Sequence, residues 1–226
     1  MAATNDPNRS RPHYRIRDTV RVIEDEGIDE LPAAGAVWST ASDMATWVRF
    51  LLDSGTVNGR RLVSDSNYRR LFAPHVMIGE DEFYSTARLT QPRWTSYGLG
   101  WFQQDYKGHY VAFHTGSLDG RTAIVGLLPE AQAGIYVFGN LDHAELRHAL
   151  MLRAFDLFLG EPARDWSSEI LRMQRASRAR ADSVRVAEGR ARVLGTRPSH
   201  PLADYAGAYV HPVFGEAVVE LVGDRL

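Results

Sequence analysis

Four short apolar segments separated by glycine-containing turns lie between residues 97 and 140, and they constrain the fold more than any other feature. The segments are 97–103, 110–117, 122–128 and 134–140, and a turn at Lys107-Gly108 joins the first two as in a β-hairpin. Segments this short, with turns this close, predict antiparallel strands. The last two segments are almost continuously apolar, which predicts strands covered on both faces.

Helical patterns flank these segments and can supply the cover. Thr40 followed by Asp43 resembles a capping box, and apolar residues then recur at helical spacing: Met44, Trp47, Val48, Leu51 and Leu52. A shorter helix is expected within 64–73, and a second apolar stripe runs from 143 to 159. Antiparallel strands with helices packed on them predict an α+β fold, an antiparallel sheet with covering helices. Three aromatic residues are expected in its core: Trp47, Trp101 and Phe138.

These patterns divide the chain into four parts. Residues 1–31 are polar and predict an extended lead-in, with one short strand at 19–23. Residues 32–160 hold the predicted sheet and its helices. Residues 161–200 predict an arginine-rich helical linker with a solvated face. A new apolar pattern follows in 201–226, and its two strands alone could not form a stable domain in water.

The composition narrows the possible chemistry. Absence of cysteine excludes disulfides, thiolate catalysis and cysteine-ligated metals, and a formal net charge of −2 gives no global attraction to nucleic acid. The first residues lack the features of a signal peptide, and no apolar run approaches the roughly 18 residues of a membrane span. His143 and His148 do not have the spacing of a zinc hydrolase motif, and we expect both on a solvent-facing side of their helix. We therefore expect no metal, no cofactor, no nucleic-acid partner and no membrane span.

The segment 110–117 ends in an unusual way for a strand, with a glycine among polar side chains. These last residues are His114, Thr115, Gly116 and Ser117. A glycine lets a ligand or another backbone approach closely, and its neighbours supply hydrogen-bond donors. A simple polar turn is the more common explanation of such residues. A self-contained group of Ser117, His114 and Asp119 is disfavoured, because residues this close on a strand seldom point at one another and no G-x-S-x-G surrounds the serine.

Five sequence blocks in a fixed order resemble the second half of the beta-lactamase-related serine hydrolases, which include class C beta-lactamases, DD-peptidases and several esterases. The blocks are 32–47, 97–101, His114-Thr115-Gly116, 128–130 and Gly139-Asn140. The match covers about residues 32–160. The tail from Leu202 onward resembles the start of a small accessory β-domain often appended to these hydrolases. The resemblance implies hydrolysis of an amide or ester through an acyl-serine.

The family uses three motifs, and the chain contains one of them. S-x-x-K supplies the acylated serine and a lysine, Y-x-N or S-x-N a proton relay, and K-T-G or H-T-G the strand beside the cleft. Lys107 is the only lysine, and Gln104 stands three places before it. No tyrosine or serine has asparagine two residues later. We therefore expect a fragment that is inactive alone, with the nucleophile encoded upstream of Met1.

The resemblance also implies roles for the motif that is present. His114 takes the place of the family's lysine or histidine, where it would tune proton transfer near the serine and attract an acidic substrate group. Thr115 would hydrogen-bond that group, and Gly116 would let it approach. The backbone N–H of Ser117 would be one of two oxyanion-hole donors, the other belonging to the missing serine. The substrate would be a small molecule or peptide, bound once an N-terminal half completes the site.

The alternative is a non-catalytic binding or partner-complementing protein. In the family, the strand that corresponds to 134–140 pairs with a strand of the N-terminal half. Without that strand its edge would be an open ladder beside apolar side chains, which is a site for docking or aggregation. We therefore also expect self-association through an open sheet edge.

Overall fold

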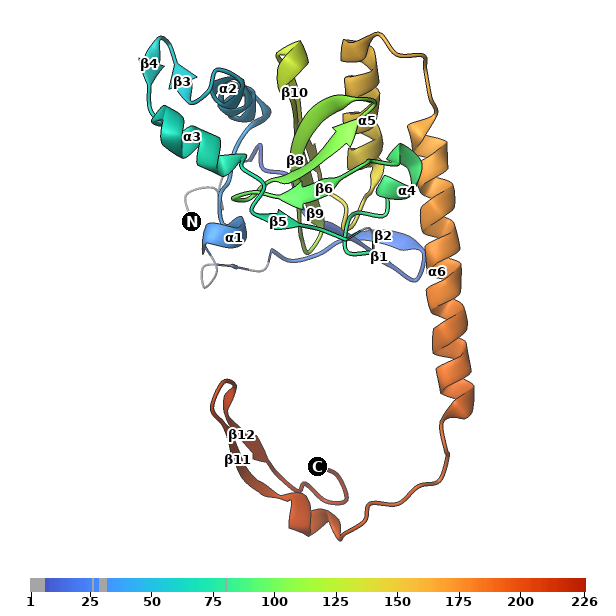
Figure 1. Cartoon of the computed structure of the whole chain (residues 1–226). Helices are drawn as coiled ribbons and strands as arrows, with labels where there is room; N and C mark the ends of the chain where they lie inside the picture. Colours follow the sequence, from blue (N-terminus) through green and yellow to red (C-terminus); the bar gives the residue numbers. More distant parts are fainter. Residues whose placement is uncertain (1–6, 26, 29–31, 80) are drawn as a thin grey trace. The chain divides into compact units, whose positions relative to one another are not determined.

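The computed structural model describes residues 7–25, 27–28, 32–79 and 81–226, and Figure 1 shows its elements in sequence colours. Two compact units, residues 1–176 and 177–226, are described separately. The expected lead-in at 1–31 lies partly outside the described residues. Within them it forms an antiparallel hairpin of β1 (His13–Ile16) and β2 (Thr19–Val22). The short strand expected at 19–23 is confirmed by β2, whereas β1 was not predicted.

An antiparallel sheet is the centre of the first unit (Figure 1). Within the described residues it has six strands in the order β10-β9-β8-β7-β6-β5. They are β5 (Val76–Met77), β6 (Thr95–Tyr97), β7 (Phe102–Tyr106), β8 (His109–Leu118), β9 (Arg121–Leu128) and β10 (Ala133–Gly139). Each neighbouring pair is antiparallel, which confirms the predicted antiparallel sheet.

The prediction of one strand at 97–103 is wrong, because the chain turns between β6 and β7. The N–H of Gly98 donates to the C=O of Trp101 at 2.8 Å, and Gly100 has a φ of +81°. A Cβ on Gly98 would lie 2.5 Å from the carbonyl oxygen of Leu71, so the turn requires glycine there. A contact with the C-terminal end of α3, rather than local periodicity, therefore determines this turn.

Helices cover the sheet on both faces, which confirms the α+β architecture. The longer helices are α2 (Ala41–Leu52), α3 (Asp65–Leu71), α5 (Leu146–Leu159) and α6 (Trp166–Ala191). Short elements complete the first unit: α1 (Pro32–Gly35), β3 (Thr56–Val57), β4 (Arg60–Arg61), α4 (Ala87–Thr90) and a 3-10 turn at Pro129–Ala131. The predicted capping box at Thr40 and Asp43 is present at the start of α2.

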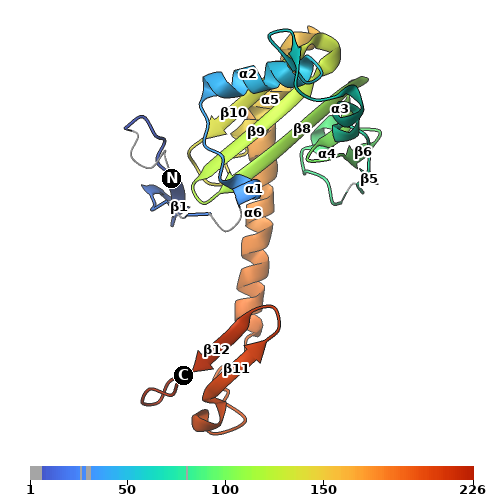
Figure 2. The same ribbon diagram turned by 90° about the vertical axis from the view of Figure 1, so that its left-hand side faces the viewer.

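Helices α2 and α5 pack closely against opposite faces of β9 and β10, and Figure 2 shows α2 lying across these strands. A Cβ on Gly134 of β10 would lie 2.5 Å from Val48 of α2. A Cβ on Gly126 of β9 would lie 2.7 Å from Met151 of α5. Because side chains alternate between the faces of a strand, these glycines allow close helix approach on the two sides of the sheet.

Burial of the strands follows their place in the sheet. Residues 124–128 of β9 are all buried, as predicted. β10 is only partly buried, contrary to prediction, because it lies at the sheet edge. The prediction of a core position is wrong for Phe138 of β10, which is 48% exposed, and for Trp47 of α2, which is 37% exposed. It is right for Trp101, which is 5% exposed and stacks on Trp47 with 5.9 Å between the ring centroids.

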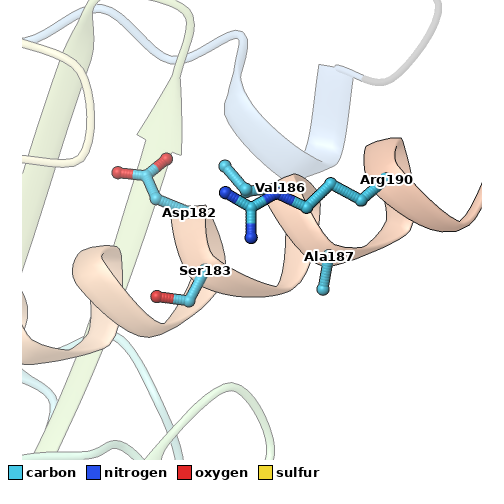
Figure 3. Close-up of a pocket in the computed structure, with 5 residues that line it drawn as sticks. All are labelled: Asp182, Ser183, Val186, Ala187 and Arg190. Carbon is cyan, nitrogen blue, oxygen red and sulfur yellow. The ribbon is translucent and has the colours of Figure 1, made fainter.

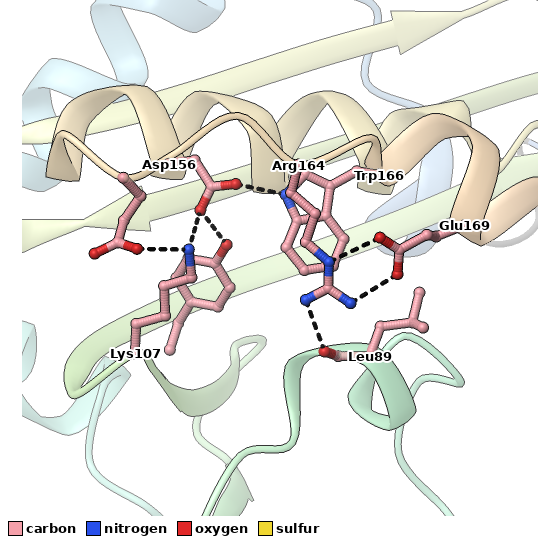
Figure 4. Close-up of polar contacts among 8 residues, drawn as sticks. Leu89, Lys107, Asp156, Arg164, Trp166 and Glu169 are labelled. Carbon is pink, nitrogen blue, oxygen red and sulfur yellow. Dashed lines mark hydrogen bonds and ion pairs between the residues drawn. The ribbon is translucent and has the colours of Figure 1, made fainter.

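A buried carboxylate joins the turn between β7 and β8 to α5 and α6 (Figure 4). Asp156 is 0% exposed; its Oδ1 accepts from Tyr106 Oη at 2.6 Å and Lys107 Nζ at 2.8 Å, and its Oδ2 from Trp166 Nε1 at 2.6 Å. Burial raises the pKa of Asp156, but these hydrogen bonds outweigh it and hold the pKa below its usual value. Lys107 also lies 3.0 Å from Glu161, so the only lysine of the chain has a structural role.

The second unit begins within α6 and ends in a small hairpin. Its elements are a 3-10 turn at Leu202–Tyr205, β11 (Gly207–His211) and β12 (Gly215–Val219), the last two antiparallel. Figure 3 shows a shallow hollow along α6, lined by Asp182, Ser183, Val186, Ala187 and Arg190. All five are exposed and belong to one helix, so this hollow is not a built binding site. No described helix has both the length and the apolar character needed to cross a membrane.

We expect Asp156→Ala to lower the free energy of unfolding by about 3–5 kcal/mol, because Tyr106, Trp166 and Lys107 lose a buried partner. Chemical denaturation of the 226-residue chain measures this change.

The difference in unfolding free energy between wild type and Asp156→Ala should be full above about pH 5 and shrink below about pH 4. The reason is that a carboxyl group with a lowered pKa stabilises the folded state only while it is ionised. As a control, Asp182→Ala on the exposed part of α6 should change stability by no more than about 0.5 kcal/mol. Equal effects of the two substitutions would contradict the anchoring role of Asp156.

Candidate functional site

The residues 114–117 lie where β8 extends beyond its neighbour β7. The register of β7 with β8 ends at the pair Phe102 and Phe113. On the other side, β9 continues to pair with β8 as far as Leu118. In the described part of the chain, β8 beyond Phe113 therefore has a strand on one side and an open edge on the other.

The hairpin turn determines which backbone groups face this open edge. Both residues of the β7–β8 turn have positive φ, +52° and +86°, as in a type I′ turn. Such a turn makes Tyr106 and His109 a hydrogen-bonded pair, and the bonding positions then alternate along the strand. Every second residue of β8 from His109 onward directs its N–H and C=O toward the β7 side. Thr115 and Ser117 belong to this set, so their backbone groups point to the side where β7 has ended.

Gly116 keeps the space beside this edge accessible. The residue is exposed, and a Cβ built on it meets no heavy atom within 4 Å. A ligand can therefore approach the backbone between Thr115 and Ser117 closely. This geometry suits the role that the sequence resemblance implies for Gly116.

Alternation along β8 places His114 on the side of the strand opposite to Thr115 and Ser117. Its Nε2 lies 3.1 Å from Tyr97 Oη, and its ring stacks on Phe102 with 5.7 Å between the ring centroids. Burial lowers the pKa of His114, with a smaller opposing effect from the backbone of Thr115. The imidazole is therefore neutral at pH 7. If His114 acts on an acidic substrate group, as the resemblance implies, it does so through a hydrogen bond rather than a full charge.

Thr115 and Ser117 point to the opposite face, which α5 covers. Thr115 Oγ1 lies 2.9 Å from Tyr84 Oη, and Ser117 Oγ accepts a hydrogen bond from Arg147 Nη1 at 2.9 Å. His114 and Ser117 thus lie on different faces of the strand. This arrangement leaves the serine hydroxyl without His114 as a base, in agreement with the argument against a self-contained triad.

A buried polar cluster at the start of α5 lies behind the end of β8, and the sequence analysis missed it. Arg147 is 6% exposed; its Nη1 also donates to the C=O of Gly116 at 2.7 Å, and its Nη2 to Glu145 Oε1 at 3.2 Å. His148 is 1% exposed, with its Nδ1 2.6 Å from Glu145 Oε2. Burial raises the pKa of Glu145, but His148 and Arg147 outweigh it, so the pKa is lower than usual and the carboxylate is ionised at neutral pH.

The prediction of a solvent-facing position is wrong for His148, because α5 packs that side onto the sheet beside Phe113. It is right for His143, whose side chain is 69% exposed. Charged residues that interrupt an apolar stripe could have drawn attention to Arg147. Its partner on the strand could not be predicted, because the two lie 31 positions apart in the sequence. Within the described residues, no group of three or more His, Cys, Asp or Glu side chains could hold a metal ion.

Comparisons with known proteins identify related sequences. The sequence profile of the Beta-lactamase family matches residues 2–157. The Unguisins hydrolase ungD of Aspergillus violaceofuscus is 28% identical over 210 residues, which cover 86% of this chain and 36% of that protein. A solved structure, that of the octameric penicillin-binding protein homologue from Pyrococcus abyssi, is 19% identical, with a TM-score of 0.44. The match covers 54% of this chain and 25% of the solved chain. The chain thus spans about a third of the hydrolase and a quarter of the solved chain.

We expect the imidazole of His114 to titrate below the usual value of about 6.5 in an NMR pH titration. Between that lowered pKa and about 6.5 the unfolded chain binds more protons than the folded chain, so stability should rise with pH through this window. In His114→Gln this part of the pH dependence should disappear, while Tyr97→Phe should keep the aromatic packing and remove only the hydroxyl contact. Titration of His114 above 6.5 would show that the ring is charged at the site.

Proposed function

Because this chain belongs to the Beta-lactamase family, we propose that residues 109–118 form the substrate-binding wall of an acyl-transfer site that hydrolyses an amide or ester bond. One observation carries the proposal: the open edge of β8 at Thr115 and Ser117, with Gly116 unobstructed between them. An extended ligand can add to such an edge through main-chain hydrogen bonds. The relative named a hydrolase supports hydrolysis as the reaction.

The N–H of Ser117 would act as an oxyanion donor in this site. A preorganised donor of this kind is worth about 2.7–4 kcal/mol in the transition state of acyl transfer. It contributes only when a nucleophile builds the oxyanion. These 226 residues contain no S-x-x-K, and Lys107 is engaged with Asp156, so the nucleophile and its base would come from residues outside this sequence.

Ser117 itself is a poor candidate for the nucleophile. Its Oγ accepts a hydrogen bond from the guanidinium of Arg147. This bond uses a lone pair of the oxygen and so makes the hydroxyl a weaker nucleophile. His114, three residues before it, lies on the other side of the strand. We therefore assign the binding contribution of Ser117 to its backbone N–H rather than to its hydroxyl.

The substrate would be a small molecule or peptide with an extended segment beside the reacting carbonyl. Neutral His114 and the hydroxyl of Thr115 offer hydrogen bonds on the two faces of the strand. The backbone of Thr115 and Ser117 offers donors and acceptors along the edge. This set suits an amide-bearing chain better than a compact anion, because the accessible groups are dipoles rather than cations.

A fluorescent penicillin or an activated ester should leave the isolated chain unlabelled, as measured by intact mass. Co-expression with a family segment that carries S-x-x-K should produce an acylated serine on that segment. In this complex Ser117→Ala should keep the acylation rate, because it keeps the N–H. Ser117→Pro removes that N–H and should lower the rate by about 10²–10³.

Two results would contradict this assignment. One is a covalent adduct on Ser117 of the isolated chain that is lost in Ser117→Ala and retained in the matched variant Ser183→Ala. The other is an equal loss of acylation in Ser117→Ala and Ser117→Pro. The first would make the hydroxyl the nucleophile, and the second would show that the side chain rather than the N–H matters.

A second candidate function is partner complementation at the other edge of the sheet. β10 is an edge strand, and the hollow beside it is lined by α2, β10 and Phe158. Several large apolar side chains around this edge are exposed: Phe138 48%, Leu150 43%, Leu157 62% and Phe158 56%. An open strand with apolar flanks favours pairing with another strand, from a partner or from a second copy of the chain.

We expect the purified chain to associate with itself as its concentration rises, as measured by sedimentation velocity. Phe138→Lys should shift the equilibrium toward monomer, because a charge at an edge opposes strand pairing. Val76→Lys places the same charge on β5, the opposite edge, where the strand has two residues, and should leave association unchanged. A wild-type chain that stays monodisperse and monomeric at high concentration would rule out this use of β10.

A further inference from the structure

One peptide group at the end of β8 has its two ends in different surroundings. The carbonyl of Gly116 and the N–H of Ser117 belong to the same peptide and point in opposite directions. The carbonyl oxygen accepts a hydrogen bond from Arg147 at 2.7 Å on the α5 side, while the N–H faces the open edge. We infer that Arg147 is a positioning residue that polarises this peptide and strengthens the Ser117 N–H as a donor. The catalytic meaning of this inference rests on the function proposed above.

The guanidinium is held firmly enough for this role. Arg147 is 6% exposed, and Nη1 contacts both Gly116 O and Ser117 Oγ, at 2.7 and 2.9 Å. Nη2 donates to Glu145, whose second carboxylate oxygen lies 2.6 Å from buried His148. The ionised Glu145 offsets the charge of the arginine in a site with little water. The arginine therefore cannot leave the peptide without breaking contacts on both sides.

The physical effect follows from the charge on the donor. Hydrogen bonds from an ionised donor are roughly twice as strong as neutral ones. Bonds in a chain also polarise one another, because electron density drawn toward the carbonyl oxygen leaves the N–H more positive. A positive charge near the carbonyl therefore makes the N–H at the other end of the peptide a better donor to a developing oxyanion. Arg147 would act through the backbone without touching the substrate.

Thr115 provides an internal comparison on the same open edge. Its N–H faces the same side as that of Ser117. The carbonyl of its peptide belongs to His114 and faces β9, as the carbonyl of Gly116 does. The hydrogen bonds of Arg147 in the described part of the chain go to Gly116, Ser117 and Glu145 and not to this peptide. Any effect of the arginine through the peptide should therefore appear at Ser117 and be absent at Thr115.

Amide hydrogen exchange reports this polarisation directly. In base-catalysed exchange, hydroxide removes the N–H proton and leaves an imidate whose negative charge lies mainly on the carbonyl oxygen; solvent then returns a deuteron to the nitrogen. A guanidinium bound to that oxygen stabilises the imidate. A polarised amide on an open edge should therefore exchange faster than an equally accessible amide without this contact.

The test is amide exchange by NMR on the 226-residue chain. In Arg147→Gln the exchange of Ser117 should slow by about five- to tenfold, the difference between a charged and a neutral hydrogen bond. Its amide proton should move upfield, and Thr115 should remain unchanged. Arg147→Lys keeps the charge and should retain part of the effect. Arg153→Gln removes a charge from the same helix and should alter neither amide.

Two outcomes would overturn the inference: no change at Ser117 in Arg147→Gln, or equal changes at Ser117 and Thr115. If the substitution unfolds the chain, the wild-type comparison decides, since Ser117 should exchange faster than Thr115 after each is referred to its rate in an unstructured peptide. None of these measurements needs a nucleophile. A failure to form acyl-enzyme in the complementation experiment would therefore count against the proposed function, and unchanged exchange would count against the role of Arg147 alone.

Discussion

The buried carboxylate of Asp156 is the constraint on which the geometry of the site is built. A carboxylate without solvent contact is tolerated only when donors surround it, and here they come from Tyr106, Lys107 and Trp166. Two of these donors lie at the end of β7 and in the turn to β8. Anchoring this turn sets the register of the hairpin, and the register decides which backbone groups of β8 face the open edge. The ion pair of Lys107 and Asp156 thus affects the end of β8 only indirectly, because the backbone groups of the strand alternate in direction from the anchored turn onward.

Features of the fold that depend on neighbouring residues could be predicted from the sequence, and features that depend on distant contacts could not. The capping box at Thr40 and the hairpin turn after β7 are local, so residue types and spacing sufficed. The turn at Gly98 depends on the carbonyl of Leu71, and the exposure of Phe138 depends on β10 lying at an edge. Periodicity describes the strand itself and contains no information on what lies beside it.

The same division applies to the site. The motif from His114 to Ser117 could be recognised because its residues are consecutive, and family resemblance implied a role for each. Arg147 and His148 escaped because their contacts cross 31 positions or follow from the packing of α5 on the sheet. The resemblance also implied that His114 attracts an acidic substrate group, whereas burial lowers the pKa of the ring and leaves it neutral. The burial of His114 depends on the residues packed around the end of β8, and the sequence does not reveal which residues these are.

The positions of the charges suggest how such a wall would favour reaction over binding. Arg147, which contacts the carbonyl of Gly116, is buried, and the ring of His114 is neutral, so a ligand on the edge meets backbone dipoles. A full charge in the pocket would attract an anionic ground state as strongly as a transition state. Dipoles aimed at one point act mainly on charge that develops there, and their orientation costs nothing during the reaction. In the proposed site, a buried arginine that strengthens one of these dipoles would therefore stabilise the transition state without adding affinity for anions in general.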